Sequence, residues 1–481
     1  MARRLRSLLA GLCALALFLY VALALMRCVH PFELEWQEGG MLREVGRVLD
    51  GEALYAEPSF DYMAFPYTPL FVWLGAASTR LFGEGFLALR LVSLLASALC
   101  FFLVFRSAAR NGGSRFAGWF AMGLFAASYR LCGAWFDVAR VDSLWLVLVL
   151  AALEVLELRP SLVGAACAGT IFFGAFLAKQ TALVPAGCVF LALAWRDARA
   201  ALVFVLALGL PLLAGTWLAD RQSDGWYGWY VFDLLRGHAW ERERILGFWL
   251  ELCGALAPVL ALSVLAHFVG VHPPRPEGKR APVHAFALAG LVLAAWLSRV
   301  HVGGYDNALM PAALAAALVF GPALASLLAA AGPVPVLASV LALLQLWLLR
   351  YDPRVQLPTR ADVAAGELLV ERLREVEGEV WVPDHGYLAE LAGKESFAHG
   401  MSLVDLFNST DHDRAQLVSD DRGRALEDKR FAVIVLEEDW SADLPALARN
   451  YTRTQIEYPE ARTLVPVTGA PRRPRYWYAR R

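Results

Sequence analysis

The sequence contains little charge for its length. Only 19% of its 481 residues are charged and 58% are hydrophobic, whereas a globular protein has about 25% charged and about 45–50% apolar residues. Lys and Arg (44) balance Asp and Glu (45), so no bulk charge attracts nucleic acid or an acidic partner. These shortages exclude a wholly soluble enzyme, a disordered protein and a nucleic-acid-binding protein.

Several familiar signatures are also missing. The seven cysteines lie in or beside apolar segments, and no pair has the spacing of a metal site. The sequence contains no glycine-rich phosphate-binding loop, no internal repeat and no low-complexity segment. Any chemistry must therefore come from polar side chains that are scattered along the chain.

The apolar excess is confined to residues 1–350, and residues 351–481 have an ordinary composition. We predict a polytopic α-helical membrane domain followed by a small soluble α/β domain, with a helix at 361–376 and strands at 379–383 and 431–436. Apolar runs of about 20 residues can cross a bilayer. The runs suggest about eleven spans: 8–26, 86–105, 116–132, 141–156, 162–177, 183–195, 201–218, 245–269, 283–297, 308–331 and 334–349.

Basic residues in short loops predict the orientation of the chain. Arg3, Arg4 and Arg6 precede the first span, which we interpret as a retained anchor because it lacks a clear signal-peptide cleavage site. The N-terminus is then inside, and four later loops agree: 106–115, 159, 196–199 and 275–280. The loop 220–244 disagrees, although it is long enough to be a folded excursion. This orientation predicts a protein of the cytoplasmic (inner) membrane with residues 351–481 outside.

The first outer segment, 27–85, is too long to be a simple connector. Within it, 40–49 has the pattern of an interfacial helix, with Met41 and Val45 on one side and Arg43, Glu44 and Arg47 on the other. The apolar run 70–82 is too short to span comfortably, and we predict a second surface helix or a re-entrant helix there.

The predicted alternation of spans places polar residues from separate parts of the sequence at outer membrane ends. Ionisable groups at such depth are costly and usually face an interior cavity. We therefore predict one outward-facing polar cavity. Its candidates are Glu33, Glu35, Glu38, Asp137, Arg140, Asp142, Lys179, Gln180, His301, Asp306 and Asn307.

Each group of candidates has a simple structural explanation as well as a functional one. The acidic cluster is either a solvated loop or a site in which Glu35 and Glu38 share a helical face and bind a cation or a hydroxyl. Asp137 and Arg140 are spaced for a local ion pair at a helix start. Lys179 either extends its ammonium to the surface or holds a phosphate. Residues 301–307 form either a polar turn or part of the cavity.

The order of several motifs resembles the membrane glycosyltransferases of the GT-C fold. The motifs are LDGEALY at 49–55, YTPLFVW at 67–73, LFG at 81–83, ALR at 88–90, RVD at 140–142, AKQT at 178–181 and GGYDNALMP at 303–311. The resemblance is to the family 39-like group, which includes protein mannosyltransferases and the aminoarabinose transferase of lipid A. In place of the group's adjacent Asp-Glu pair, this sequence has Glu35 and Glu38.

The resemblance implies a donor sugar on a polyprenyl phosphate and an acceptor hydroxyl on an unidentified glycan, lipid or protein, with membrane lipids as further partners. One carboxylate, Glu35 or its rival Glu38, would be the general base. Lys179, Arg140 or His301 would stabilise the departing phosphate, and Tyr67 lies in the matching turn. One base and a cationic clamp imply inversion at the anomeric carbon. A divalent metal ion is left open, because related enzymes vary on this point.

Two other functions remain as alternatives. A transporter or flippase of a lipid-linked or polar substrate predicts polar residues near mid-bilayer and two related halves. A non-catalytic envelope assembly protein predicts that Glu35 and Glu38 can be replaced without loss.

Overall fold

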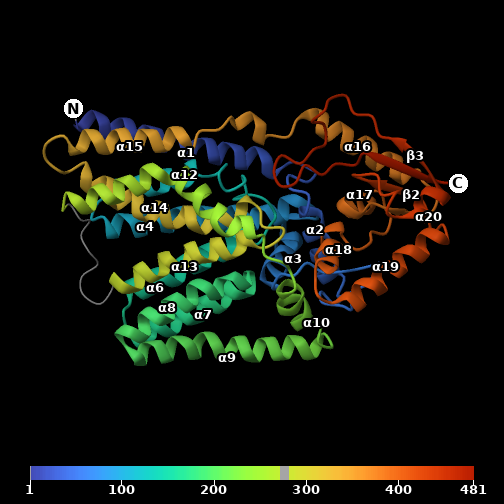
Figure 1. The fold of residues 1–481 in the computed structure, drawn as a ribbon, viewed down its shortest axis with the longest axis horizontal. Coiled ribbons are helices and arrows are strands. Elements are labelled where there is room, and N and C mark those ends of the chain that lie inside the picture. The colour runs from blue at the N-terminus through green and yellow to red at the C-terminus, as the bar shows by residue number, and fades with distance from the viewer. Residues whose placement is uncertain (1, 271–280) are drawn as a thin grey trace.

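The computed structural model describes residues 2–270 and 281–481. A bundle of helices occupies one end of the molecule and a small sheet occupies the other, with α2, α3 and α18 between them (Figure 1). Three basic residues that supported the predicted orientation, Arg275, Lys279 and Arg280, lie outside the described residues.

The bundle is built from the apolar segments. Each predicted span coincides with a helix, and serine or aspartate side chains cap several starts: Ser114 accepts from the Phe116 amide, and Asp197 from the Arg199 amide. The helices are α1 (Ala2–Cys28), α4 (Phe86–Asn111), α5 (Arg115–Ala127), α6 (Asp142–Leu158), α7 (Leu162–Ala178), α8 (Leu183–Arg196), α9 (Ala198–Gln222), α12 (Arg242–Phe268), α13 (Ala281–Val300), α14 (Met310–Leu327) and α15 (Val334–Leu348).

Six of these segments are long and apolar enough to cross a membrane, and a seventh is added if α15 and the bent helical segment after it form one span. The chain is therefore a multi-pass membrane protein. Several bundle helices, such as α7 and α8, are shorter than a full crossing. The number of eleven crossings stays a prediction.

The segment 27–85 contains the two expected helices, α2 (Glu38–Leu49) and α3 (Leu70–Phe82). The prediction for the polar side of α2 was wrong at one residue, since Glu44 is buried and not solvated. Its carboxylate accepts a hydrogen bond from the Phe65 amide at 2.5 Å, which compensates in part for the water lost on burial. The loop 220–244 folds into α10 (Trp226–Gly228), the π-helical turn η2 (Trp229–Asp233) and α11 (Leu234–Arg236).

The last part of the chain carries a four-stranded sheet in the order β1-β2-β4-β3, in which β1 is parallel to β2 and the other neighbours are antiparallel. The strand predicted at 379–383 ends early, because Pro383 cannot donate to a ladder and begins a 3₁₀ turn. The elements are η5 (Pro353–Gln356), α16 (Arg360–Arg374), β1 (Glu379–Trp381), η6 (Pro383–His385), α17 (Gly386–Leu391), α18 (Gly400–Phe407), α19 (His412–Glu427), β2 (Phe431–Leu436), α20 (Pro445–Asn450), β3 (Tyr451–Gln455) and β4 (Tyr476–Arg480). The division into domains at residue 350 stays a prediction.

Candidate functional site

The two leading carboxylates fit neither of the alternatives for the acidic cluster. They are buried and not solvated, and they do not share a helical face, because α2 begins at Glu38 and Glu35 precedes it. Glu38 is fully buried and forms a two-point ion pair with Arg90, at 3.0 Å to Oε1 and 2.6 Å to Oε2. The amides of Ala139 (2.6 Å) and Leu34 (2.7 Å) also donate to it. Burial by itself would raise the pKa of Glu38, but the Arg90 guanidinium and these donors leave that pKa below its ordinary value.

Glu35 is equally buried, with 0% exposure, but its surroundings differ. Among residues 2–270 and 281–481, neither carboxylate oxygen receives a hydrogen bond of normal geometry, and the Arg140 guanidinium lies 3.6 Å from Oε2. Burial raises the pKa of Glu35 to about 8, and the charge of Arg140 and the nearby Gln37 amide offset only part of that rise. A carboxyl group in this state changes its protonation near pH 8, and its ionised form is a stronger base than an ordinary carboxylate.

Arg140 links Glu35 to Tyr67. Its NH2 group donates to the Tyr67 hydroxyl at 2.8 Å, and its guanidinium lies 5.7 Å from the Phe65 ring centroid. Gln180 fixes the turn that presents Tyr67, because its side-chain amide donates to the Pro66 carbonyl at 2.7 Å. Burial raises the pKa of the Tyr67 hydroxyl, which keeps it a neutral hydrogen-bonding group.

A second group of polar side chains gathers around Asp142. The Lys179 ammonium lies 2.7 Å from Oδ1, and the Asn307 amide donates to the same oxygen at 3.2 Å. The Trp135 indole donates to Oδ2 at 2.9 Å. Lys179 and Asp142 are close enough to Tyr67 to affect its pKa, so this group adjoins the first. We call the combined set the site cluster: Glu35, Tyr67, Arg140, Asp142, Lys179 and Asn307.

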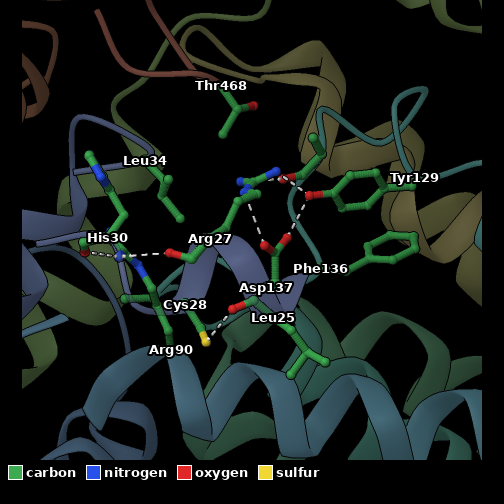
Figure 2. Close-up of polar contacts among 12 residues, drawn as sticks. Leu25, Arg27, Cys28, His30, Leu34, Arg90, Tyr129, Phe136, Asp137 and Thr468 are labelled. Carbon is green, nitrogen blue, oxygen red and sulfur yellow. Dashed lines mark hydrogen bonds and ion pairs between the residues drawn. The ribbon is translucent and has the colours of Figure 1, made fainter. Parts of the chain in front are cut away.

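Other candidates lie apart from the site cluster. The expected local pair of Asp137 and Arg140 was wrong, because Asp137 pairs with Arg27 at 3.1 Å and accepts from the Tyr129 hydroxyl at 2.7 Å. Figure 2 shows Arg27, Asp137 and Tyr129 in a closed group at the end of α1. The partner of Asp137 is therefore set by tertiary contacts and not by its spacing from Arg140 in the sequence.

The 301–307 segment is divided between two surroundings. Asn307 joins the site cluster, whereas Asp306 pairs with Arg299 at 3.1 Å and Arg130 at 3.6 Å. The His301 ring packs 5.5 Å from the Trp240 ring, and burial together with His238 lowers its pKa.

Sequence reasoning missed the residues that the C-terminal part contributes. Gly469 has a φ of +79° and lies against Glu35, where an added Cβ would come within 2.9 Å of Oε1. Thr468 pairs with Glu35 as a parallel β-bridge. Asp405 of α18 is also buried, which raises its pKa to about 7, and the charge of Arg140 lowers it only in part. No motif in 351–481 marked these residues.

The donor groups near Glu35 do not resemble a metal site. Within the two described ranges, no group of three or more His, Cys, Asp or Glu side chains is arranged to hold a metal ion. The Arg140 guanidinium, 3.6 Å from Glu35, would repel a cation placed beside that carboxylate.

The arrangement of the bundle, helices α2 and α3 and the C-terminal sheet is the GT-C fold. It is similar to ArnT from Cupriavidus metallidurans bound to undecaprenyl phosphate, with a TM-score of 0.59 and 14% identity over 97% of each chain. The apo form of that protein gives a TM-score of 0.57 over 96% of this chain and 97% of ArnT, also at 14% identity.

A second solved structure with this fold is the archaeal oligosaccharyltransferase AglB from Archaeoglobus fulgidus, in complex with an inhibitory peptide and a dolichol-phosphate. Its TM-score is 0.52 at 11% identity, covering 92% of this chain and 72% of AglB. The sequence matches no protein-family model and no curated protein.

Proposed function

We propose that this protein is a membrane glycosyltransferase that moves a sugar from a polyprenyl phosphate to an acceptor hydroxyl at the outer face of the membrane. The observation that carries the proposal is the Glu35–Arg140 pair: a buried carboxylate with a pKa of about 8 that faces a guanidinium at 3.6 Å. It lies in a chain with the fold of proteins whose solved structures hold undecaprenyl phosphate and dolichol-phosphate.

Glu35 is the general base in this proposal. It takes the proton of the acceptor hydroxyl while that oxygen attacks the anomeric carbon, and the bond from this carbon to the phosphate oxygen breaks. The products are the glycosylated acceptor and free polyprenyl phosphate. Because a phosphate leaves without protonation and the carboxylate acts on the opposite face of the sugar, the reaction inverts the anomeric carbon. Gly469 covers Glu35, so this cover moves when the acceptor enters.

Arg140 and Lys179 supply the positive charge that the leaving phosphate requires. Arg140 is nearly fully buried and Lys179 is partly exposed, so a phosphate near both would meet little competition from water. Asp142 and Asn307 orient the lysine, and the Tyr67 hydroxyl offers one more hydrogen bond. No step of the proposal uses a metal ion.

Glu38 was the rival candidate for the base. All four of its short contacts are donors, and two come from Arg90. Proton transfer to Glu38 would break this ion pair in a buried place, which is strongly unfavourable. We therefore propose that Glu38 holds α2 and the neighbouring loop in position.

The two alternative functions make different demands. A flippase requires polar side chains along a path near mid-bilayer, whereas the site cluster gathers at one end of the bundle, beside the C-terminal part of the chain. An assembly protein has no use for a buried carboxylate with an elevated pKa, since such a group costs folding free energy. The site cluster favours the enzyme over both.

The experiment is a transfer assay on the purified, membrane-reconstituted protein. It uses a panel of undecaprenyl-phosphate hexoses and pentoses with total envelope lipids and glycans as acceptors, and mass spectrometry detects released undecaprenyl phosphate and new glycosylated product. We expect turnover of at least one donor, and a loss of about 10²–10⁴-fold in Glu35→Gln.

The matched control is Glu367→Gln, the same substitution on the exposed side of α16, which should keep the full rate. Full activity in Glu35→Gln would overturn the assignment of the base. If the envelope lipids and glycans gain no sugar and no donor of the panel is turned over, the proposed function is overturned.

A further inference from the structure

The short segment that carries Glu35 contacts the C-terminal part at every residue. His385 bonds to the Glu33 carboxylate, the Thr468 amide donates to the Leu34 carbonyl at 3.1 Å, and Gly469 lies against Glu35. The Trp36 ring packs 5.5 Å from the ring of His399. The geometry of residues 33–36 therefore depends on chain that lies at least 350 residues away in sequence.

His385 is the charged member of this contact. Its Nδ1 bonds to Glu33, and its Nε2 lies 2.9 Å from Oε1 of Glu437, which directly follows β2. All three side chains are buried. An imidazole with a carboxylate beside each ring nitrogen is favoured in its positively charged, doubly protonated form. Burial opposes this charge, yet the two carboxylates hold the pKa of His385 well above its ordinary value.

Glu35 thus lies between two ion-paired glutamates, one bonded to the C-terminal part of the chain and the other to the bundle. Two residues before it, Glu33 is bonded to His385 of the C-terminal part and also accepts from the Gly39 amide at 2.9 Å. Three residues after it, Glu38 is bonded to Arg90 of the bundle. Glu35 has little hydrogen bonding of its own, so these two ion pairs hold its carboxylate opposite Arg140.

We propose that His385 is a positioning residue for the glycosyl transfer, acting through Glu33 on the Glu35 carboxylate. This inference rests on the proposed function. Misplacing a reacting group by about 1 Å can cost about 10²-fold in rate. His385 pairs with carboxylates on both sides, whereas Arg140 and Lys179 pair with Glu35, Tyr67 and Asp142. Loss of His385 therefore lowers kcat and leaves the KM for the lipid donor unchanged.

The test compares His385→Gln with His412→Gln, a matched change at an exposed histidine on α19. Two readouts are taken on the reconstituted full chain. The first is kcat and KM with the undecaprenyl-phosphate sugar that the wild-type protein turns over. The second is hydrogen exchange in peptides covering residues 32–41, with peptides from α14 as the reference.

We expect His385→Gln to lose about 10²-fold in kcat, to keep its KM within about twofold, and to exchange faster in 32–41 but not in α14. His412→Gln should match the wild-type protein in every readout. A wild-type kcat in His385→Gln, or a lower kcat with unchanged exchange in 32–41, would overturn the inference.

If His385→Gln does not fold, Glu33→Gln decides, because it leaves His385 bonded to Glu437. The same loss in kcat and the same faster exchange are expected, and wild-type values in this variant contradict the proposal. Failure here is separable from failure of the proposed function. An inactive Glu35→Gln beside a normal His385→Gln removes only the positioning role, whereas an absence of turnover in the wild-type protein removes the proposed function.

Discussion

The two ends of the helical bundle handle buried charge in different ways. At the end away from the sheet, Arg110 bonds to both oxygens of Glu154 at 2.8 and 2.7 Å and also to Glu157. His284 contributes a 2.7 Å contact to Glu157. At the end beside the sheet, the Glu35 carboxylate meets Arg140 at 3.6 Å and receives no hydrogen bond of normal geometry from the chain as described.

The difference separates structural charge from functional charge. A buried charge that serves the fold is paired and hydrogen-bonded, because an unpaired one costs free energy. The Arg110 network follows this rule, and so does the Glu38–Arg90 pair. Glu35 departs from it, and such departures occur where a group must be free to react. Burial by itself does not distinguish these carboxylates, since the exposure of Glu35 and Glu38 is the same.

The largest effect on stability is expected at Glu38. Glu38→Gln leaves the buried Arg90 guanidinium without its counter-charge, which should lower the free energy of unfolding by about 3–5 kcal/mol. Chemical or thermal unfolding of the purified protein measures it. The same change at Glu35 should cost less than about 1 kcal/mol, because its charged form is poorly stabilised. Equal losses at both positions would remove the distinction between them.

Arg140 and Arg110 allow a matched comparison of activity at the two ends. Arg140→Gln should lower the rate of sugar transfer by about 10²–10³-fold, since it removes charge from the leaving phosphate. Arg110→Gln should leave the rate per folded molecule close to that of the wild-type protein. The rate of undecaprenyl phosphate release measures both. A larger loss of rate in Arg110→Gln than in Arg140→Gln would show that the reaction does not take place at the end of the bundle beside the sheet.

The network at the opposite end should respond in stability alone. Glu157→Gln removes the partner charge of both Arg110 and His284, and we expect a loss of about 1–3 kcal/mol in unfolding free energy. Transfer activity of the folded fraction should be unchanged. A fall in kcat without a fall in stability would show that this end takes part in catalysis.

The smallest expected effect is that of pH. Glu35 acts as a base only when ionised, and burial raises its pKa to about 8, so kcat/KM should rise about tenfold from pH 6 to pH 7 and level off above pH 8. The unfolded chain loses this proton near the ordinary value of 4.5, so Glu35 weakens folding as the pH rises from there towards 8. A kcat/KM that is constant from pH 6 to pH 8 would exclude Glu35 as the base.

The site was predictable in its parts but not in its pairings. Asp142, Lys179 and Asn307 were expected at one end of the bundle, and the structure brings their side chains within hydrogen-bonding distance. The alternation of spans predicts which helix ends lie on the same side of the membrane. It does not predict how each helix is rotated about its axis or which side chains pair. It therefore failed for Asp137, which bonds to Arg27 across 110 positions of sequence.

The segment 27–85 shows the same limit of prediction from sequence. The helix at α2 followed from its amphipathic pattern, yet the burial of Glu44 did not, since the Phe65 amide that pairs with it lies beyond a turn. The choice between Glu35 and Glu38 was open for this reason. It depends on Arg90, Ala139 and Gly469, which come from three separate regions.

The sequence by itself determined that the chain is a membrane protein with polar residues at the ends of its apolar segments, because hydrophobic length and loop charge are local properties. The tertiary structure decided that the Glu38 carboxylate has a full set of hydrogen-bond donors, whereas the Glu35 carboxylate faces Arg140 with little hydrogen bonding. It also decided that His385, Thr468 and Gly469 hold the segment around Glu35. Pairing between buried charges depends on contacts between distant segments, and these exist only once the bundle and the sheet have packed together.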